Sequence, residues 1–169
     1  NSYGSASGSV YLRIAPDGVT PAGNGGDGLY ISGDATLVAY NDQSRPSVIS
    51  GNGGSGIEIS NAGEENLIYG VRIGTTRLGT QAVPNAVDGI TIGGTLNQIG
   101  QPGTAYRNLI SGNAGAGIFL WGPSNTILNS YIGTNVLGTA ALPNGGNGLV
   151  IYGDHNIIGS SAANGGNLI

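Results

Sequence analysis

The chain has 169 residues, of which 34 are glycine, 38% are hydrophobic and none is cysteine. Its formal net charge is −4 and only 8% of its residues are charged, so it lacks the basic surface of a nucleic-acid-binding protein. The lack of cysteine excludes disulfides and thiolate metal sites, and the glycines show no triplet period, which excludes collagen. No stretch approaches the about 18 apolar residues of a membrane-spanning helix. We therefore expect that the protein does not bind nucleic acid and does not insert into a membrane.

A short strand that begins with glycine recurs along the chain. Its five copies are Gly28–Ile31, Gly56–Ile59, Gly89–Ile92, Gly117–Leu120 and Gly148–Ile151, and successive copies begin 28, 33, 28 and 31 residues apart. Repetition at this period is typical of a solenoid, in which each unit buries its apolar face only against its neighbours. We expect one β-helix domain over residues 1–169, with coils starting near these five glycines, as an excerpt or repeat unit of a longer rod.

Two further strands follow in each repeat. The second opens with asparagine in four repeats, at Asn66, Asn97, Asn125 and Asn156, and is degenerate at 37–39. The third alternates between the type seen at 108–113 and the type seen at 131–134, with Arg13–Ile14 as a worn copy near the start. Because the two types alternate, the true unit is a pair of coils.

Three short strands separated by Gly, Asn and Ser turns predict one triangular turn of a right-handed parallel β-helix. The expected fold class is all-β, with about five three-stranded coils and no capping helix, because Gly, Pro or Asn interrupts every candidate helix. Apolar residues at every second position give each strand an inward face. The expected inward residues are Leu29, Ile31, Ile57, Ile59, Ile90, Ile92, Ile118, Leu120, Leu149 and Ile151 on the first strand, Ile68, Ile99, Ile127 and Ile158 on the second, and Ile14, Ile49, Ile73, Ile110, Ile132 and Ile169 on the third.

The third strand also has an expected outward row. It consists of Arg13, Val48, Arg72, Leu109, Tyr131 and Leu168. Its large aliphatic side chains suggest contact with another protomer or with a covering loop.

Asparagine recurs at two corner positions of the coil. One set is Asn66, Asn97, Asn125 and Asn156, and the other includes Asn52 and Asn113. Stacked side-chain amides can hydrogen-bond along the axis of an in-register β stack and can satisfy backbone groups at its turns. The repeated asparagines therefore predict a structural asparagine ladder.

The strings at 108–113, 117–120 and 131–134 carry a resemblance. The chain from about Val10 to Ile169 resembles the right-handed parallel β-helix repeats of bacterial secreted and surface proteins, in the superfamily that also contains pectate lyases, polygalacturonases and phage tailspikes. The resemblance implies the fold, while the superfamily hosts lyases, hydrolases, adhesins and structural rods. Its enzymes use an acidic Ca²⁺ cluster with an arginine base, or paired aspartates with Gly-His-Gly and Arg-x-Lys, and these motifs do not occur here.

The titratable residues form no catalytic set. His155, the only histidine, lies in a turn beside Asp154 without an identifiable nucleophile. Asp27 and Asp88 precede strands two coils apart, at about 9.6 Å, which is the outer edge of the inverting-glycosidase separation. Asp-Gly turn chemistry explains both better. Glu58, expected on an outward strand face, has no second acid among its strand neighbours, so we expect it to be solvated.

No cofactor is expected. The pair Glu64–Glu65 lies in a longer turn that could hold a Ca²⁺ ion or meet Arg72 or Arg107, but no motif supports a metal and a solvated loop is the favoured interpretation.

Four aromatic residues are the candidate binding residues. Tyr30, Phe119, Trp121 and Tyr131 could stack on sugar rings or form an interface. The sequence favours an extracellular or cell-surface structural or adhesive rod, with end-to-end self-association into a filament as the sharpest form of that hypothesis. The alternative is a polysaccharide-binding or polysaccharide-degrading module. An enzymatic role stays open, and the favoured interpretation is a non-enzyme.

Overall fold

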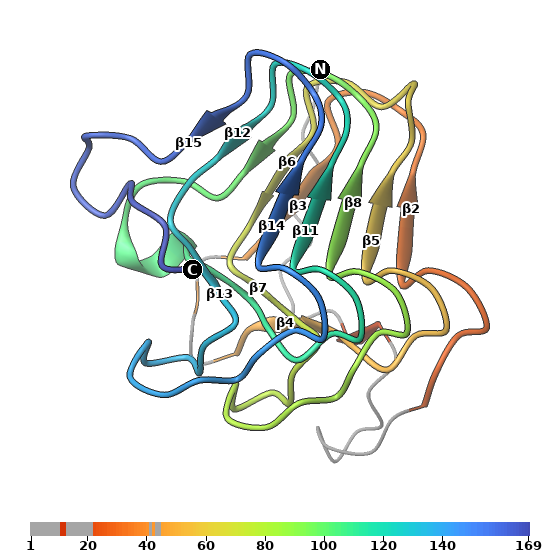
Figure 1. Cartoon of the computed structure of the whole chain (residues 1–169), viewed down its shortest axis with the longest axis vertical. Helices are drawn as coiled ribbons and strands as arrows, with labels where there is room; N and C mark the ends of the chain where they lie inside the picture. Colours follow the sequence, from red (N-terminus) through yellow and green to blue (C-terminus); the bar gives the residue numbers. More distant parts are fainter. Residues whose placement is uncertain (1–10, 13–21, 41, 43–44) are drawn as a thin grey trace.

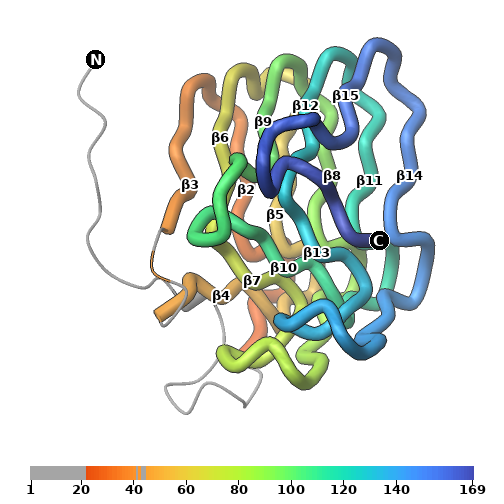
Figure 2. The backbone as a smooth tube through the Cα atoms, turned by 90° about the vertical axis from the view of Figure 1, so that its left-hand side faces the viewer, coloured from red at the N-terminus to blue at the C-terminus, as the bar shows by residue number. Residues whose placement is uncertain are grey.

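The computed structural model describes residues 11–12, 22–40, 42 and 45–169. These residues form a right-handed parallel β-helix of about four turns, built from three sheets of five strands each, which confirms the predicted fold class (Figure 1). The coils lie side by side along the axis, from β3 (Leu37–Ala39) to β15 (Ile157–Ile158) (Figure 2). The only helical element of the described residues is the three-residue turn η1 (Thr104–Tyr106), so none of their helices could cross a membrane.

Each sheet collects one strand from every coil, and all pairs are parallel. Sheet 1 contains β2 (Leu29–Ile31), β5 (Ile57–Ile59), β8 (Ile90–Ile92), β11 (Ile118–Leu120) and β14 (Leu149–Ile151). Sheet 2 contains β3, β6 (Leu67–Tyr69), β9 (Gln98–Ile99), β12 (Thr126–Ile127) and β15. Sheet 3 contains β1 (Tyr11–Leu12), β4 (Ser47–Ile49), β7 (Val71–Ile73), β10 (Asn108–Ile110) and β13 (Ser130–Ile132).

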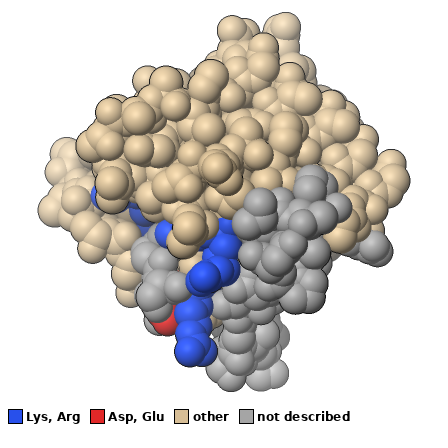
Figure 3. All heavy atoms as spheres, turned by 90° about the horizontal axis from the view of Figure 1, so that it is seen from below, with Lys and Arg blue, Asp and Glu red and all other residues tan. Residues whose placement is uncertain are grey.

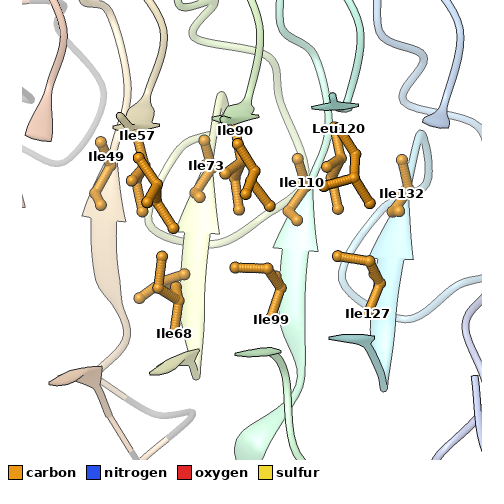
Figure 4. Packing of buried hydrophobic residues seen from close by; sticks show 14 of the residues in the cluster. Ile49, Ile57, Ile68, Ile73, Ile90, Ile99, Ile110, Leu120, Ile127 and Ile132 are labelled. Atoms are coloured by element: carbon orange, nitrogen blue, oxygen red, sulfur yellow. The ribbon is translucent and has the colours of Figure 1, made fainter. Parts of the chain in front are cut away.

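The core consists of stacked isoleucines that point inward from the three sheets (Figure 4). The expected inward residues of the inner coils are buried; they are Ile31, Ile49, Ile57, Ile59, Ile68, Ile73, Ile90, Ile92, Ile99, Ile110, Ile118, Leu120, Ile127 and Ile132. Burying such a side chain contributes about 1.5–3 kcal/mol, so rows of aliphatic side chains stabilise a narrow prism without helices.

The expectation of inward burial fails at the last coil of the described stack. Ile151, Ile158 and Ile169 are exposed because no further coil packs on the last one. The expected copy at Arg13–Ile14 lies outside the described residues, and the strand that pairs with β4 is instead β1, Tyr11–Leu12.

The outward row of sheet 3 is largely covered. Val48, Arg72 and Leu109 are buried on the outer side of the sheet. The loop at 76–81 folds back over this side and is closed by the antiparallel bridge between Thr75 and Ala82. Arg72 Nη1 donates a hydrogen bond to the Arg77 carbonyl oxygen within this loop.

The equivalent loop at 135–140, one pair of coils later, also folds back over the outer side of sheet 3. It is closed by the bridge between Thr134 and Ala141. A Cβ atom on Gly79 would lie 2.7 Å from Leu109, and one on Gly138 would lie 2.8 Å from both Tyr131 and Leu168. Of the two explanations that the sequence left open for this row, the covering loop is the one that the structure shows.

The glycine that begins each sheet 1 strand is required by close contact between coils. A Cβ atom on Gly89 would lie 2.5 Å from the Gly117 carbonyl oxygen and 2.5 Å from Ile110 Cγ2. Gly56 and Gly117 have the same surroundings one coil away. Separations under 3 Å leave no room for a side chain, so the spacing of the coils explains why glycine recurs at this position.

The four asparagines at the corner before sheet 2 are hydrogen-bonded in series. The backbone N–H of Asn66 and its Nδ2 both donate to Asn97 Oδ1 at 2.9 Å, and the Asn97 N–H donates to Asn125 Oδ1 at 2.8 Å. The Asn125 N–H donates to Asn156 Oδ1 at 2.7 Å. The side-chain nitrogens donate to corner carbonyls such as that of Gly63, 3.1 Å from Asn97 Nδ2. This series is called the sheet 2 ladder below.

A second series lies at the corner before sheet 1. Asn52 Nδ2 donates to Asn85 Oδ1, Asn85 Nδ2 to Asn113 Oδ1, and Asn113 Nδ2 to Asn144 Oδ1, at 2.8–3.0 Å. The Asn24 side chain extends the series through Asn52 Oδ1 at 3.1 Å. Asn85 and Asn144 belong to it although each follows a proline in the longer loops, which hid their equivalence to Asn52 and Asn113 in the sequence.

Asn97→Ala is expected to destabilise the protein by about 3 kcal/mol or more. The substitution leaves two buried donors of Asn66 and the Gly63 carbonyl without their partner, and each such loss costs about 1–3 kcal/mol. The measurement is urea-induced unfolding followed by circular dichroism. Asn61→Ala, at an exposed turn residue, serves as the control and should change the unfolding free energy by less than about 0.5 kcal/mol. Equal effects of the two substitutions would contradict a structural ladder.

Candidate functional site

The outer face of sheet 1 carries most of the aromatic candidates. Tyr30, Glu58, Thr91, Phe119 and Val150 form one row across neighbouring strands, in the register that the repeats predict. Tyr30 and Phe119 are three strands apart in this row, or about 14 Å at 4.8 Å per strand. Tyr30 is therefore separate from the other aromatic residues of this face.

Three aromatic side chains gather at the other end of that face. The rings of Phe119 and Tyr152 are 5.7 Å apart between centroids. Trp121, which directly follows β11, lies against Gly93, where a Cβ atom would be 2.8 Å from Trp121 Cζ2. Trp121 is 45% exposed and Tyr152 is 75% exposed. Tyr152 was missed in the sequence, although it directly follows β14 as the named Trp121 follows β11, and this equivalence is the signal that could have found it.

The aspartates at the corner before sheet 1 hold turns. Asp27 Oδ1 accepts a hydrogen bond from the Ser55 N–H, and Asp88 Oδ1 accepts one from the Ala116 N–H, both at 2.7 Å. Each carboxylate thus satisfies a backbone donor of the next coil, as an Asn or Asp side chain does in a turn. This geometry supports the turn interpretation of both residues over a catalytic one.

Glu58 has an acidic neighbour that its strand does not reveal. The pKa of Glu58 is raised from its ordinary value, first by burial, then by the negative charge of Asp27 and by a hydrogen bond with the Asp27 side chain. Asp27 comes from the corner before β2, so it lies outside the strand row, in which Glu58 has no second acid as expected, and Glu58 remains partly exposed. Two adjacent carboxyl groups can share a proton. Among the described residues, no three His, Cys, Asp or Glu side chains are placed to hold a metal ion.

His155 occupies a corner position that is filled by unrelated residues in the other coils. It is exposed and has a positive φ of 59°. In each of the other coils, the equivalent residue directly precedes the corner before sheet 2. These residues are Ala35, Glu65, Leu96 and Ser124, and their φ angles lie between 52° and 59°. Because alanine, glutamate, leucine and serine serve equally well here, the position requires a backbone conformation and not an imidazole.

Glu64 and Glu65, which the sequence analysis considered as possible Ca²⁺ ligands, are exposed. The Glu64 N–H donates to Asp34 Oδ1 at 3.0 Å, which is a turn contact between neighbouring coils. Glu65 is one of the corner residues with positive φ. Both glutamates therefore take part in turn geometry.

A hollow lies on the outer side of sheet 3. Its volume is about 550 Å³, and it is lined by Asp42, Arg72, Thr104, Ala105, Arg107, Leu109, Tyr131 and Val136. This hollow is called the sheet 3 groove below. The Arg107 guanidinium carbon lies 4.1 Å from the centroid of the half-buried Tyr131 ring, a cation–π contact. One ring face of Tyr131 is thus occupied by an arginine, which limits the predicted role of Tyr131 in sugar stacking.

A smaller hollow lies beside sheet 2. It has about 310 Å³ and is lined by Ala35, Thr36, Leu37, Glu65, Leu67 and Tyr69. The ring of Tyr69 meets that of Tyr106, from η1, edge to face at 5.2 Å. Half of its lining residues are aliphatic, and Glu65 is its only charged lining residue.

Glu58→Gln is expected to raise stability at pH 7 and to leave it unchanged at low pH. Because the pKa of Glu58 is raised in the folded state, the charged form disfavours folding, and this cost appears as pH rises from the ordinary value of 4.5 through the raised one. The gain at pH 7 should be below about 1 kcal/mol, since the site is open to solvent.

The measurement is the melting temperature at pH 7 and at pH 3.5. Glu64→Gln, the same change at an exposed turn, should leave both values nearly unchanged. A Glu58→Gln variant that melts at or below the wild-type temperature at pH 7 would show that Asp27 and Glu58 do not repel each other.

Comparisons with protein-family models, with curated proteins and with solved structures found no match to this chain. The structure itself shows a parallel β-solenoid architecture.

Proposed function

We propose that this chain is part of an extracellular or cell-surface β-helical rod with a structural or adhesive role, and that its coils stack end to end. The exposed apolar surface of the last coil carries the proposal. Ile151 and Ile158 are 43% and 38% exposed, whereas Leu120 and Ile127, their partners one coil earlier, are fully buried. The last coil thus repeats the side chains that stack inside the rod.

The backbone of both end coils supports stacking as well. Among the described strands of sheet 1, β14 pairs only with β11, and β2 pairs only with β5. All strands of the sheet run in one direction, so the free edge of β14 can pair with a strand equivalent to β2 in the same parallel manner. Such a head-to-tail contact does not close on itself and therefore generates a filament.

The resemblance of the repeats to bacterial secreted and surface β-helices supports the proposed location. The strings at 108–113 and 131–134 lie on sheet 3 strands and their following turns, where a repeat of that class is expected to place them. Low charge and the lack of cysteine agree with an extracellular setting.

A polysaccharide-binding module is the second candidate. The exposed Trp121 and Tyr152, with Phe119 packed against Tyr152, offer ring faces on which sugars can stack. Stacking on aromatic rings does not require catalytic groups, so this candidate is independent of the turn roles of Asp27, Asp88 and His155.

The rod proposal predicts regular filaments in negative-stain electron microscopy of the protein at micromolar concentration. Ile151→Asp, which places a charge on the stacking surface, should abolish them. Leu78→Asp is the matched control, because Leu78 is 64% exposed on the loop between β7 and β8, in the middle of the stack, and it should leave filaments intact. Discrete particles in the wild type, or equal loss in both variants, would contradict end-to-end stacking. Circular dichroism verifies that both variants are folded.

A further inference from the structure

We propose that the chain also associates side by side with further copies of itself, with the outer side of sheet 3 in one copy docked on the outer side of sheet 1 in the next. The inference goes beyond the end-to-end rod and does not depend on it, because it concerns the sides of the stack and not its ends. The observation that carries it is the separation of charge between these two sides.

The outer side of sheet 3 is positively charged, although the chain is acidic overall. Arginine side chains gather on one part of the surface when the molecule is viewed from this side (Figure 3). Asp42 is the only carboxylate of the described residues among them, so four arginines against one aspartate leave a net charge of +3, whether or not these groups pair with one another. The four arginines lie on sheet 3 strands, just before them, or in the covering loop at 76–81; they are Arg45, Arg72, Arg77 and Arg107.

The outer side of sheet 1, taken with the corners that border it, has the opposite charge. Glu58 lies on β5, while Asp27 and Asp88 come just before β2 and β8. Four more carboxylates lie in the turns between sheet 1 and sheet 2; they are Asp34, Glu64, Glu65 and Asp154. No arginine of the described residues lies on this side, so the seven carboxylates give a net charge of −7.

Like charges already lie close together on each of the two sides. Burial, and after it the positive charge of Arg77, lowers the pKa of Arg72. Burial, and after it the negative charge of Asp27, raises the pKa of Glu58. A neighbour that presents the opposite charge would offset both repulsions, whereas two copies docked through the same side would increase them. The charges therefore favour contact between unlike sides.

The net charge of −4 opposes association only weakly at short range. The Debye length is about 8 Å at physiological ionic strength, so docked surfaces respond mainly to the charges that face each other. Both sides also expose apolar surface: Tyr30 on sheet 1 is 58% exposed, and Leu137 on the loop at 135–140 is 71% exposed. Because the two docked surfaces differ, each added copy leaves one of them free and the assembly stays open.

The test is sedimentation velocity of the Ile151→Asp variant, so that stacking through the last coil does not contribute. At submillimolar protein and about 0.1 M salt, this variant should form complexes larger than a single chain. At about 1 M salt, where the Debye length is about 3 Å, the complexes should dissociate. A single chain at the lower salt concentration, or complexes that persist unchanged at the higher one, would overturn the proposal.

Charge reversals in the same background identify the two sides that dock. Arg77→Glu, at an exposed loop residue on the sheet 3 side, should weaken association at least about fivefold. Glu64→Arg, at an exposed turn residue on the sheet 1 side, should have a similar effect. Thr126→Glu adds a negative charge to the partly exposed outer row of sheet 2, and as the control it should change association less than about twofold. Equal weakening by Arg77→Glu and Thr126→Glu would mean that no specific surface docks.

A mixture of the two charge-reversed variants tests the pairing of unlike sides. The Arg77→Glu chain keeps an intact sheet 1 side, and the Glu64→Arg chain keeps an intact sheet 3 side. An equimolar mixture should therefore associate more strongly than either variant alone at the same total concentration. A mixture that associates no better than the separate variants would contradict the proposal. Circular dichroism verifies that every variant is folded.

Discussion

The contact on which the rest of the structure depends is the hydrogen bond that an asparagine side chain accepts from the backbone of the preceding coil. In the sheet 2 ladder it links Asn66 to Asn97, Asn97 to Asn125 and Asn125 to Asn156. A corner interrupts the sheets, so its backbone donors would otherwise be buried without partners, at about 1–3 kcal/mol each. Each asparagine accepts a hydrogen bond from the backbone of one neighbouring coil and donates its own backbone N–H to the asparagine of the next. The same corner can therefore repeat in every coil at the spacing of the strands in a sheet.

This constraint determines where function can lie. The interior is filled with isoleucine rows and the corners with amides, so neither has space for chemistry without breaking the stack. What can vary is the outside of the sheets, the loops between sheet 3 and the next coil, and the end surfaces. The exposed aliphatic surface of the last coil is of this kind, and so is the groove that Arg107 and Tyr131 help to form on sheet 3.

Periodicity in the sequence predicted the strands, their register and the inward face, because each of these repeats in every coil. Ile57 and Ile90, for example, pair as the glycine-led strands require. Features that occur once, or once in two coils, were not predictable in this way. The loop that covers Leu109 depends on how 76–81 folds back, and the contact of Asp27 with Glu58 joins a corner to a strand of the next coil.

The sheet 3 groove belongs to the same unpredicted class. Its lining combines the strand residues Arg72, Leu109 and Tyr131 with side chains from η1 and from two loops. In the sequence, Tyr131 is recognisable only as an aromatic residue that could form a binding surface, and Arg107 only as a possible partner for glutamates. Only the folded chain shows that the two stack on each other.

Hydrogen exchange of individual backbone amides tests the central role of the ladder most directly. The Asn97 N–H donates to a buried side-chain oxygen and the Asn125 N–H to a partly buried one, whereas that of Thr139 donates to an asparagine side chain in an exposed loop. The core amide of Ile118 is expected to exchange only when the whole stack opens. If the ladder holds the coils together, the Asn97 and Asn125 amides should exchange as slowly as that of Ile118. Exchange of Asn97 and Asn125 as fast as that of Thr139 would show that the coils are held by their sheets alone.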